Sequence, residues 1–256
     1  MITNLWQGVS GMVAQQTRVD VVGHNLANEH TVGFKSNRVA FIDLLSRRIT
    51  PVASQGTATR PSSGLIGTLA LVIPTFDQGI MVETGNQADL ALEGSGFFKV
   101  VLPDGSIAFT RGGTFSPNAN GELMTAGGYL LDPVIVLPPE CTSYSVRENG
   151  EVLGADVDGT VTSLGMIEVY TVSYPENMAA LGRNLYTTTP ASGPAILHQA
   201  GAEGVGVIKQ GFREQAEVDL VTELTNLIVA TRAYAVNARA VQAVDEMWGG
   251  ANNLRK

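Results

Sequence analysis

The stretch DLVTELTNLIVATRAYAVNARAVQAVDEMW, residues 219–248, decides the architecture of this chain. Its apolar residues recur at alternating spacings of four and three, which predicts a long helix with one narrow apolar seam. Asp219 stands where an N-cap is expected. Such a seam is typical of long helices that pack on each other or on other chains, and two ordinary helices of one bundle would also explain it. The seam positions are Leu220, Leu224, Leu227, Thr231, Tyr234, Ala238, Val241, Asp245 and Trp248.

A second helix is predicted near the N-terminus, over residues 4–28. It has a similar heptad spacing, with Thr3 as a plausible N-cap and Gly33 shortly after its end. We therefore expect the two terminal helices to pair as a coiled-coil layer. The apolar seam residues of this helix are Leu5, Val9, Met12, Val19 and Leu26.

Between the helices, short β-prone runs alternate with turn signals, which predicts an antiparallel β-domain over residues 70–205. Four pairs offer residues able to take the positive φ of hairpin turns. These pairs are Asp104-Gly105, Asn120-Gly121, Asn149-Gly150 and Asp158-Gly159.

The segments that join these parts lack periodicity and are rich in Gly, Pro, Ser and Thr. Residues 46–66 are predicted to form an extended loop, and a loop of this length is often an interaction element. The fold class is therefore α+β. The expected domains are a terminal helical domain of residues 1–33 plus 217–256, a linker region of 34–69 plus 206–216, and the β-domain of 70–205.

The net charge of −8 argues against a nucleic-acid partner, because phosphate binding needs a basic face. The single cysteine, Cys141, excludes an internal disulfide and is expected to be a buried small apolar residue. No apolar run is long enough for membrane insertion. The N-terminal residues lack the pattern of a cleaved signal peptide, so we expect export, if it occurs, to leave them intact.

No motif argues for a metal, a cofactor or catalysis. His24, His30 and His198 lack partners at metal-ligand spacing, and no phosphate-binding or nucleophile motif is present. Asn118, Asn120 and Glu122 fit a hairpin turn better than a Ca²⁺ loop. The sequence therefore predicts no enzyme.

Large aromatic residues stand near the helical ends, and two interpretations stay open for them. They could belong to the core of the chain, or they could anchor contacts between chains. These residues are Trp6, Phe34, Phe41, Tyr234 and Trp248.

The stretch NLANEHTVGFKSNR, residues 25–38, resembles the N-terminal signature of bacterial flagellar rod and hook proteins. Residues 88–131 resemble their shared strand region, and residues 223–248 resemble their C-terminal helix. The signature residues are Asn25, Leu26, Ala27, Asn28, Thr31, Gly33, Phe34 and Lys35, followed by Arg232, Ala233 and Tyr234 in the C-terminal helix.

The resemblance is strongest to family members of the distal part of the basal-body rod. It implies a structural subunit that polymerises with itself into a stiff hollow shaft and is exported uncleaved by the flagellar type III apparatus. The implied partners are the proximal rod proteins, the hook protein and, in a Gram-negative cell, the surrounding P- and L-rings. The terminal helices would line the inner tube and fold on assembly. Within residues 46–66, we expect Arg47, Arg48, Pro51, Arg60 and Pro61 to lock neighbouring subunits.

Two other functions stay open at the level of sequence. A hook or proximal rod subunit of the same family would differ in whether its filament bends. A secreted β-rich adhesin would keep its binding activity without the terminal helices.

Overall fold

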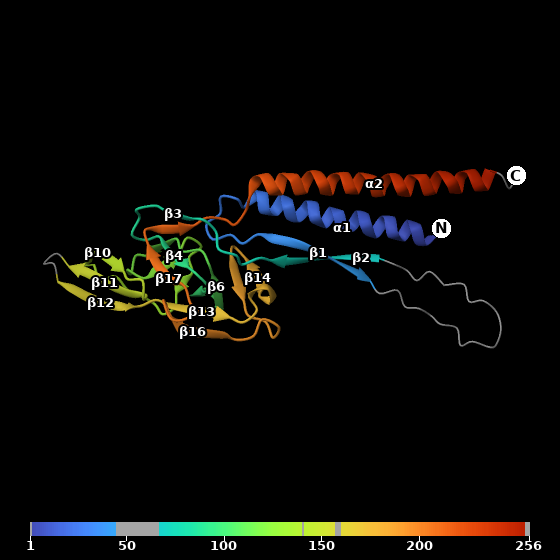
Figure 1. Ribbon diagram of the computed structural model, residues 1–256. Helices are drawn as coiled ribbons and strands as arrows, with labels where there is room; N and C mark the ends of the chain where they lie inside the picture. The colour runs from blue at the N-terminus through green and yellow to red at the C-terminus, as the bar shows by residue number, and fades with distance from the viewer. Residues whose placement is uncertain (1, 45–66, 140, 157–159, 254–256) are drawn as a thin grey trace, which may run out of the picture. The chain divides into compact units, whose positions relative to one another are not determined.

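The computed structural model describes residues 2–44, 67–139, 141–156 and 160–253. These residues form an α+β fold, with a long helix at either end and antiparallel strands between, as the sequence predicts (Figure 1). The chain divides into two compact units. Unit 1 comprises residues 1–26, 37–73 and 219–256, and unit 2 comprises residues 27–36 and 74–218.

Unit 1 contains both long helices, α1 (Ile2–Ala27) and α2 (Leu220–Asn253). The predicted N-cap of α2 is confirmed, because Asp219 Oδ1 accepts a hydrogen bond from the backbone N–H of Val221 at 3.1 Å. The Thr222 hydroxyl donates to Asp219 Oδ2 at 2.5 Å. This hydroxyl bond lowers the pKa of the Asp219 carboxyl, so the cap stays charged at the positive end of the helix dipole.

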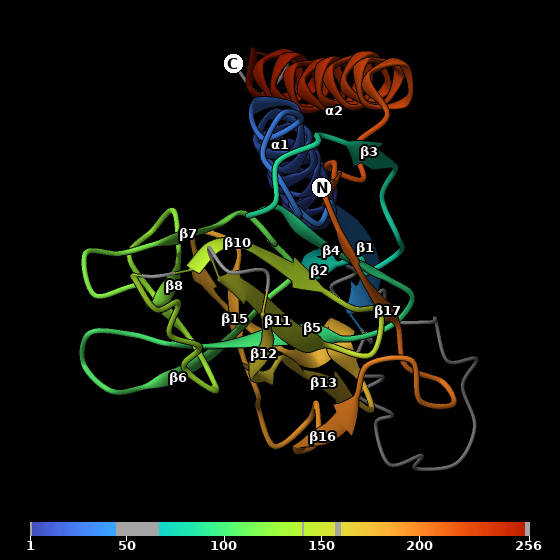
Figure 2. The same ribbon diagram turned by 90° about the vertical axis from the view of Figure 1, so that its left-hand side faces the viewer.

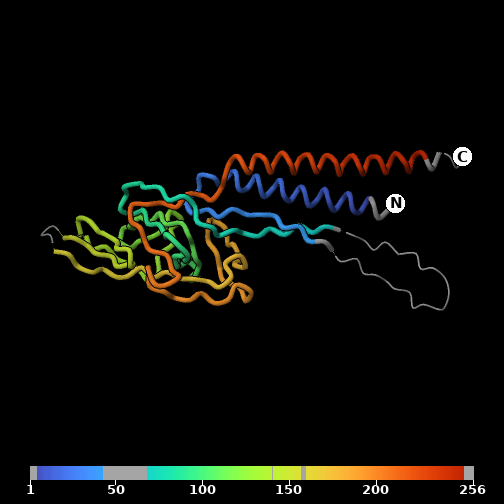
Figure 3. The backbone as a smooth tube through the Cα atoms, viewed as in Figure 1, coloured from blue at the N-terminus to red at the C-terminus, as the bar shows by residue number. Residues whose placement is uncertain are grey.

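The two helices lie side by side and run in opposite directions (Figures 1, 2 and 3). Glycines in the first half of α1 permit a close approach to the second half of α2. A Cβ atom built on Gly8 would lie 2.6 Å from Cγ2 of Val241, and one built on Gly11 would lie 2.9 Å from Nδ2 of Asn237. A methyl group at position 8 would therefore collide with Val241, and one at position 11 would displace the Asn237 side-chain amide.

The helix pair buries small side chains and leaves large ones in solvent. Ala14, Val22 and Ala230 are buried. Soluble monomers rarely expose so many large apolar residues on one pair of helices. The exposed large apolar residues of the two helices are Trp6, Val9, Val13, Leu220, Val221, Leu224, Ile228, Val229, Tyr234, Val236, Met247 and Trp248.

Unit 1 also contains a two-stranded ribbon of β1 (Asn37–Leu44) and β2 (Gly67–Pro74). It lies largely within residues 34–69, which the sequence suggests are a linker. The ribbon exposes apolar side chains on neighbouring positions, such as Phe41 and Ile42, so its sequence lacks the alternation that identifies a half-buried strand.

Unit 2 consists of short antiparallel strands and one 3₁₀ turn, η1 (Pro175–Asn177). Its largest sheet has the order β14-β15-β6-β5-β9-β8-β7, with β13 pairing both β5 and the edge strand β16. The strands are β3 (Met81–Glu83), β4 (Leu90–Glu93), β5 (Phe97–Val101), β6 (Ile107–Thr110), β7 (Phe115–Pro117), β8 (Leu123–Thr125), β9 (Leu130–Leu131), β10 (Cys141–Val146), β11 (Glu151–Asp156), β12 (Val161–Met166), β13 (Glu168–Val172), β14 (Ala179–Gly182), β15 (Leu185–Thr187), β16 (Ala195–Gln199), β17 (Val207–Gln210) and β18 (Phe212–Glu214).

The core of unit 2 lies on both faces of β5. Successive side chains of a strand point to opposite faces, so Phe97 and Phe98 enter different clusters. Phe98 packs edge-to-face on Phe115, with ring centroids 5.4 Å apart. Phe97 packs against Phe109 and other apolar residues on the other side. The adjacent apolar residues are therefore explained by a strand that is covered on both faces.

Three of the four predicted turns are confirmed, with one change in their geometry. The glycine alone takes a positive φ, +81° at Gly105 and Gly121 and +89° at Gly150, while the preceding Asp or Asn does not. Such a turn has one left-handed residue, rather than the two of a type I′ turn. The fourth pair, Asp158-Gly159, lies outside the described residues.

Three other expectations change in the structure. Helix α1 begins at Ile2, so Thr3 lies in its first turn and not at an N-cap. Cys141 is half-buried, because it is the first residue of β10, an edge strand of the β10-β11-β12 sheet, where its thiol donates to the carbonyl of Ser143. Residues 206–216, expected to be a linker, contain β17 and β18, which pair with β4 and β3.

Across the described residues, neither long helix combines the length and hydrophobicity that a membrane-spanning helix needs.

The glycine contact between the helices can be tested by one substitution made at two positions of α1. Gly23→Ala should raise the free energy of unfolding by about 0.5–1 kcal/mol, because an added Cβ meets nothing within 4 Å there. Gly8→Ala should instead lower it by about 1–2 kcal/mol, because the methyl group collides with Val241. Urea unfolding followed by far-UV circular dichroism measures both. Equal stabilisation by the two variants would contradict the close approach.

Candidate functional site

The signature segment after α1 begins with a tight turn. The backbone N–H of Thr31 donates to the Asn28 carbonyl at 2.9 Å, and that of Phe34 donates to the Thr31 carbonyl at 3.2 Å. Gly33 has a φ of +65°, and a Cβ atom there would lie 2.7 Å from the backbone nitrogen of Gly112. Both the conformation and the space therefore require glycine at position 33.

Asn25 of the signature belongs to unit 1 and is buried. Its Nδ2 donates to the Asn37 carbonyl at 2.8 Å and to Oε1 of Glu223 at 3.1 Å, and its Oδ1 accepts from the Asn37 backbone N–H at 2.9 Å. One amide therefore joins the last turn of α1, the start of β1 and the first turn of α2. Leu26 beside it is half-buried, and Ala27 is exposed.

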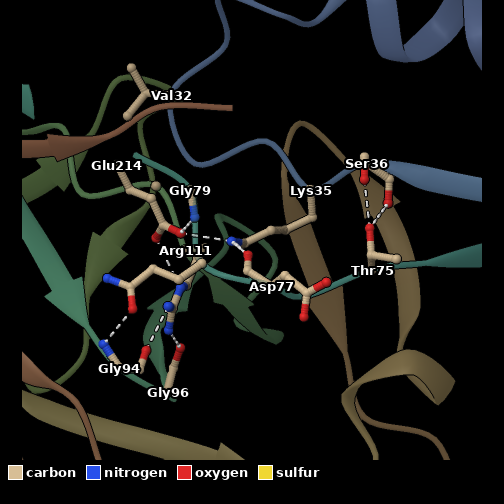
Figure 4. Close-up of polar contacts among 12 residues, drawn as sticks. Val32, Lys35, Ser36, Thr75, Asp77, Gly79, Gly94, Gly96, Arg111 and Glu214 are labelled. Atoms are coloured by element: carbon tan, nitrogen blue, oxygen red, sulfur yellow. Dashed lines mark hydrogen bonds and ion pairs between the residues drawn. The ribbon is translucent and has the colours of Figure 1, made fainter. Parts of the chain in front are cut away.

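Lys35, the last of the N-terminal signature residues, lies inside unit 2 with its side chain fully buried (Figure 4). Its Nζ donates to Oε1 of Glu214 at 2.7 Å and to the carbonyl of Asp77 at 2.5 Å. The same Glu214 oxygen accepts from the backbone N–H of Gly79 at 2.9 Å.

Arg111 completes this buried ion cluster, which we define as Lys35, Arg111 and Glu214. The Nε of Arg111 donates to Oε2 of Glu214 at 3.0 Å. Its two terminal nitrogens donate to the carbonyls of Gly96 at 2.5 Å and Gly94 at 2.6 Å (Figure 4). The guanidinium thus joins the connection between β4 and β5 to the Glu214 carboxylate.

Burial lowers the pKa of the Lys35 ammonium, while the nearby Glu214 carboxylate raises it. An isolated buried charge is unstable, and the two cations and the carboxylate tolerate burial because every one of them has hydrogen-bonded partners. Such a cluster fixes the arrangement of the segments that carry it. The Lys35 ammonium donates two hydrogen bonds inside the cluster, so the arrangement is that of a structural joint.

The predicted seam residues divide into two groups in the structure. Arg232 of the C-terminal signature is exposed, and Ala233 is half-buried on the side of α2 that carries buried Ala230. The half-buried seam residues are Leu5, Met12, Val19, Leu26, Leu227 and Val241. The exposed seam residues are Val9, Leu220, Leu224, Tyr234 and Trp248.

The aromatic residues divide in the same way. Phe34 is buried in unit 2 and belongs to the core of the chain. Trp6, Phe41, Tyr234 and Trp248 are exposed, which makes them available for contacts with other chains. The candidate locking residues Arg47, Arg48, Pro51, Arg60 and Pro61 lie outside the described residues.

Within the part of the chain that the structure describes, no three His, Cys, Asp or Glu side chains gather as metal ligands would. A hollow of about 270 Å³ lies beside Gly96, Phe97 and Pro175. Its charged lining residue is Arg111, whose guanidinium is already bound to Glu214 and two carbonyls.

The sequence analysis missed Arg111 and Glu214 as functional partners of Lys35. They lie 103 residues apart, and Glu214 lies 179 residues from Lys35. The one local signal is the Gly112-Gly113 pair after Arg111, because a Cβ atom on Gly113 would lie 1.5 Å from the Leu90 carbonyl oxygen. A glycine pair beside an arginine indicates close backbone packing there, and it does not identify the carboxylate.

Three family profiles match the chain. The profile described as Flagellar hook protein FlgE/F/G D1 domain matches residues 91–154. That of the Flagellar basal body rod FlgEFG protein C-terminal matches residues 209–254, and that of the Flagella basal body rod protein matches residues 7–35.

Curated relatives match over nearly the whole chain. A flagellar basal-body rod protein FlgG from Borreliella burgdorferi is 40% identical, with 100% of both chains covered. Proteins of the same name from Caulobacter vibrioides and from Buchnera aphidicola subsp. Schizaphis graminum are 36% and 35% identical, with 96% of this chain and 97% of each relative covered.

The importance of the buried ion cluster can be tested with one substitution at two lysines. Lys35→Met should lower the free energy of unfolding by about 2–3 kcal/mol, because Arg111 still pairs with Glu214 but the buried Glu214 oxygen and the Asp77 carbonyl lose the donor that Lys35 provides. Lys209→Met should change it by about 0–1 kcal/mol, because Lys209 and its partner Glu93 are partly exposed, with Nζ and Oε2 2.5 Å apart. Urea denaturation measures both, and similar losses would argue against a special role of Lys35.

Proposed function

We propose that this chain, which belongs to the family of flagellar basal-body rod proteins, builds the distal part of the rod. It is a structural subunit of that rod. In this role it polymerises with copies of itself into a stiff, hollow shaft that transmits torque to the hook. We propose a mechanical function without catalysis.

The observation that carries the proposal is the exposed apolar surface of the helix pair. The pair buries small residues such as Ala14 and Ala230, while Leu224, Tyr234 and Trp248 stay in solvent on α2. A surface of this kind needs a partner, and a partner surface elsewhere on an identical copy gives a heterologous contact. When such a contact does not close into a ring, it builds a filament.

In the assembled shaft, α1 and α2 of neighbouring copies pack as a coiled-coil layer that forms the inner tube. This proposal assigns residues 1–33 plus 217–256 to the inner domain and residues 70–205 to the outer β-domain, with 34–69 plus 206–216 joining them. The exposed seam residues make contacts between subunits. The half-buried seam residues connect the helix pair of one subunit to the helix pair of the neighbouring subunit.

The partners follow from the position in the shaft. We propose proximal rod proteins at one end, the hook protein at the other, and the P- and L-rings around the shaft in a Gram-negative cell. Delivery to the growing tip uses the flagellar type III export apparatus. A hook or proximal rod role is the alternative, and the bending of the filament distinguishes it.

The role of the apolar seam can be tested at two exposed positions of α2. Trp248→Ser should raise the critical concentration for polymerisation about 30-fold, because a buried interface aromatic contributes about 2 kcal/mol. Gln242→Ser, an exposed polar position of the same helix, should leave it nearly unchanged. Sedimentation of filaments from the purified chain measures both. Normal polymerisation of the Trp248 variant would contradict the assignment of the apolar seam to the interface between subunits.

The role of the 46–66 loop can be tested by deletion. Removing residues 46–64 should give a curved or flexible filament, because the segment that we propose to lock neighbouring subunits is lost. A variant in which the same residues are scrambled separates loop length from loop sequence. Electron microscopy of purified basal bodies measures curvature, and a rod that stays straight after the deletion would refute the locking role.

A further inference from the structure

The segments that lead from unit 2 into unit 1 are tied together inside unit 2. The backbone N–H of Glu217, next to the end of unit 2 at residue 218, donates to the Phe34 carbonyl at 3.3 Å. The backbone N–H of Thr75 donates to the Ser36 carbonyl at 2.8 Å, and the two hydroxyls lie 2.6 Å apart (Figure 4). The chain changes from one unit to the other four times, after residues 26, 36, 73 and 218. The last three of these points lie next to this small, hydrogen-bonded region of unit 2.

One carboxyl oxygen of the half-buried Glu217 lies in this region without a hydrogen-bond partner among the described residues. Oε2 of Glu217 is buried, and no donor of the described residues bonds to it. The charged groups that act on it are Lys35 from the signature turn, Asp77 from the segment before β3, and Glu214 from β18. Asp77 and Glu214 repel an ionised Glu217, and the Lys35 ammonium already donates to Glu214 and to the Asp77 carbonyl.

We propose that Glu217 is a proton-sensitive latch: its neutral carboxyl keeps residues 215–218 docked on residues 31–36, and its ionised carboxylate loosens that contact. The neutral form removes the repulsion from Asp77 and Glu214 and adds a hydroxyl donor. The ionised form is poorly solvated and has two like charges as neighbours.

The electrostatics agree with the geometry. Burial raises the pKa of the Glu217 carboxyl to about 7 from its ordinary value of 4.5, with Asp77 and Glu214 adding to the increase and Lys35 opposing it. The folded state therefore holds a proton that the open state releases. The docked arrangement loses stability as the pH rises from about 4.5 to about 7, and the loss is complete above that range.

Hydrogen exchange of the full-length monomer tests the latch without any need for polymerisation. Exchange rates are divided by the intrinsic chemical rate at each pH, so that only protection is compared. Two amides report on the contact, those of Gly33 and Glu217, which donate to the carbonyls of Glu214 and Phe34. Their protection in the wild-type chain should fall about tenfold between about pH 6 and about pH 8.

Glu217→Gln, a neutral side chain of the same shape, should keep the protection high and independent of pH. Glu203→Gln, which neutralises an exposed carboxyl of unit 2, should behave as the wild type does. Wild-type protection that does not change with pH, or an equal fall in the Glu217→Gln chain, would overturn the latch. An NMR titration of the Glu217 carboxyl carbon gives an independent readout, and a midpoint near its ordinary value of 4.5 would also refute it.

Discussion

A single carboxylate, that of Glu214, holds together segments that are far apart in the sequence. It accepts hydrogen bonds from Lys35 after α1, from the backbone of Gly79 before β3, and from Arg111 after β6. A buried charge without these partners would be strongly destabilising, so the signature turn, β18 and the Arg111 region must take their places together. The chemistry of this one joint thus fixes the segment of unit 2 from which the chain continues into unit 1.

The two units differ in how completely they bury their large apolar side chains. Unit 2 covers β5 on both faces and places Phe97 and Phe98 in separate clusters, which is the behaviour of a self-sufficient domain. Unit 1 brings its helices close through Gly8 and Gly11 and leaves Trp248 and other large side chains exposed. The proposed polymer would explain this division, because one part of the subunit would be stable alone and the other would be covered by neighbouring copies.

Local rules predicted much of the fold. The heptad spacing predicted α2, the Asp219 cap was confirmed by two hydrogen bonds, and Gly105, Gly121 and Gly150 form the expected turns. The ribbon of β1 and β2 was not predicted, because apolar residues at neighbouring positions hide the alternation of a strand. Cys141 was expected inside and is half-buried, since edge position depends on strand order, which spacing does not reveal.

The sequence by itself determined the two long helices, the antiparallel middle and the family signature, because periodicity, caps and turn residues act over a few positions. Only the tertiary structure decided why the signature ends in Lys35, since its partners Arg111 and Glu214 come from distant strands. It also decided which seam residues are half-buried and which are exposed. Contacts of this kind depend on the register of packed elements, and register arises from the whole chain at once.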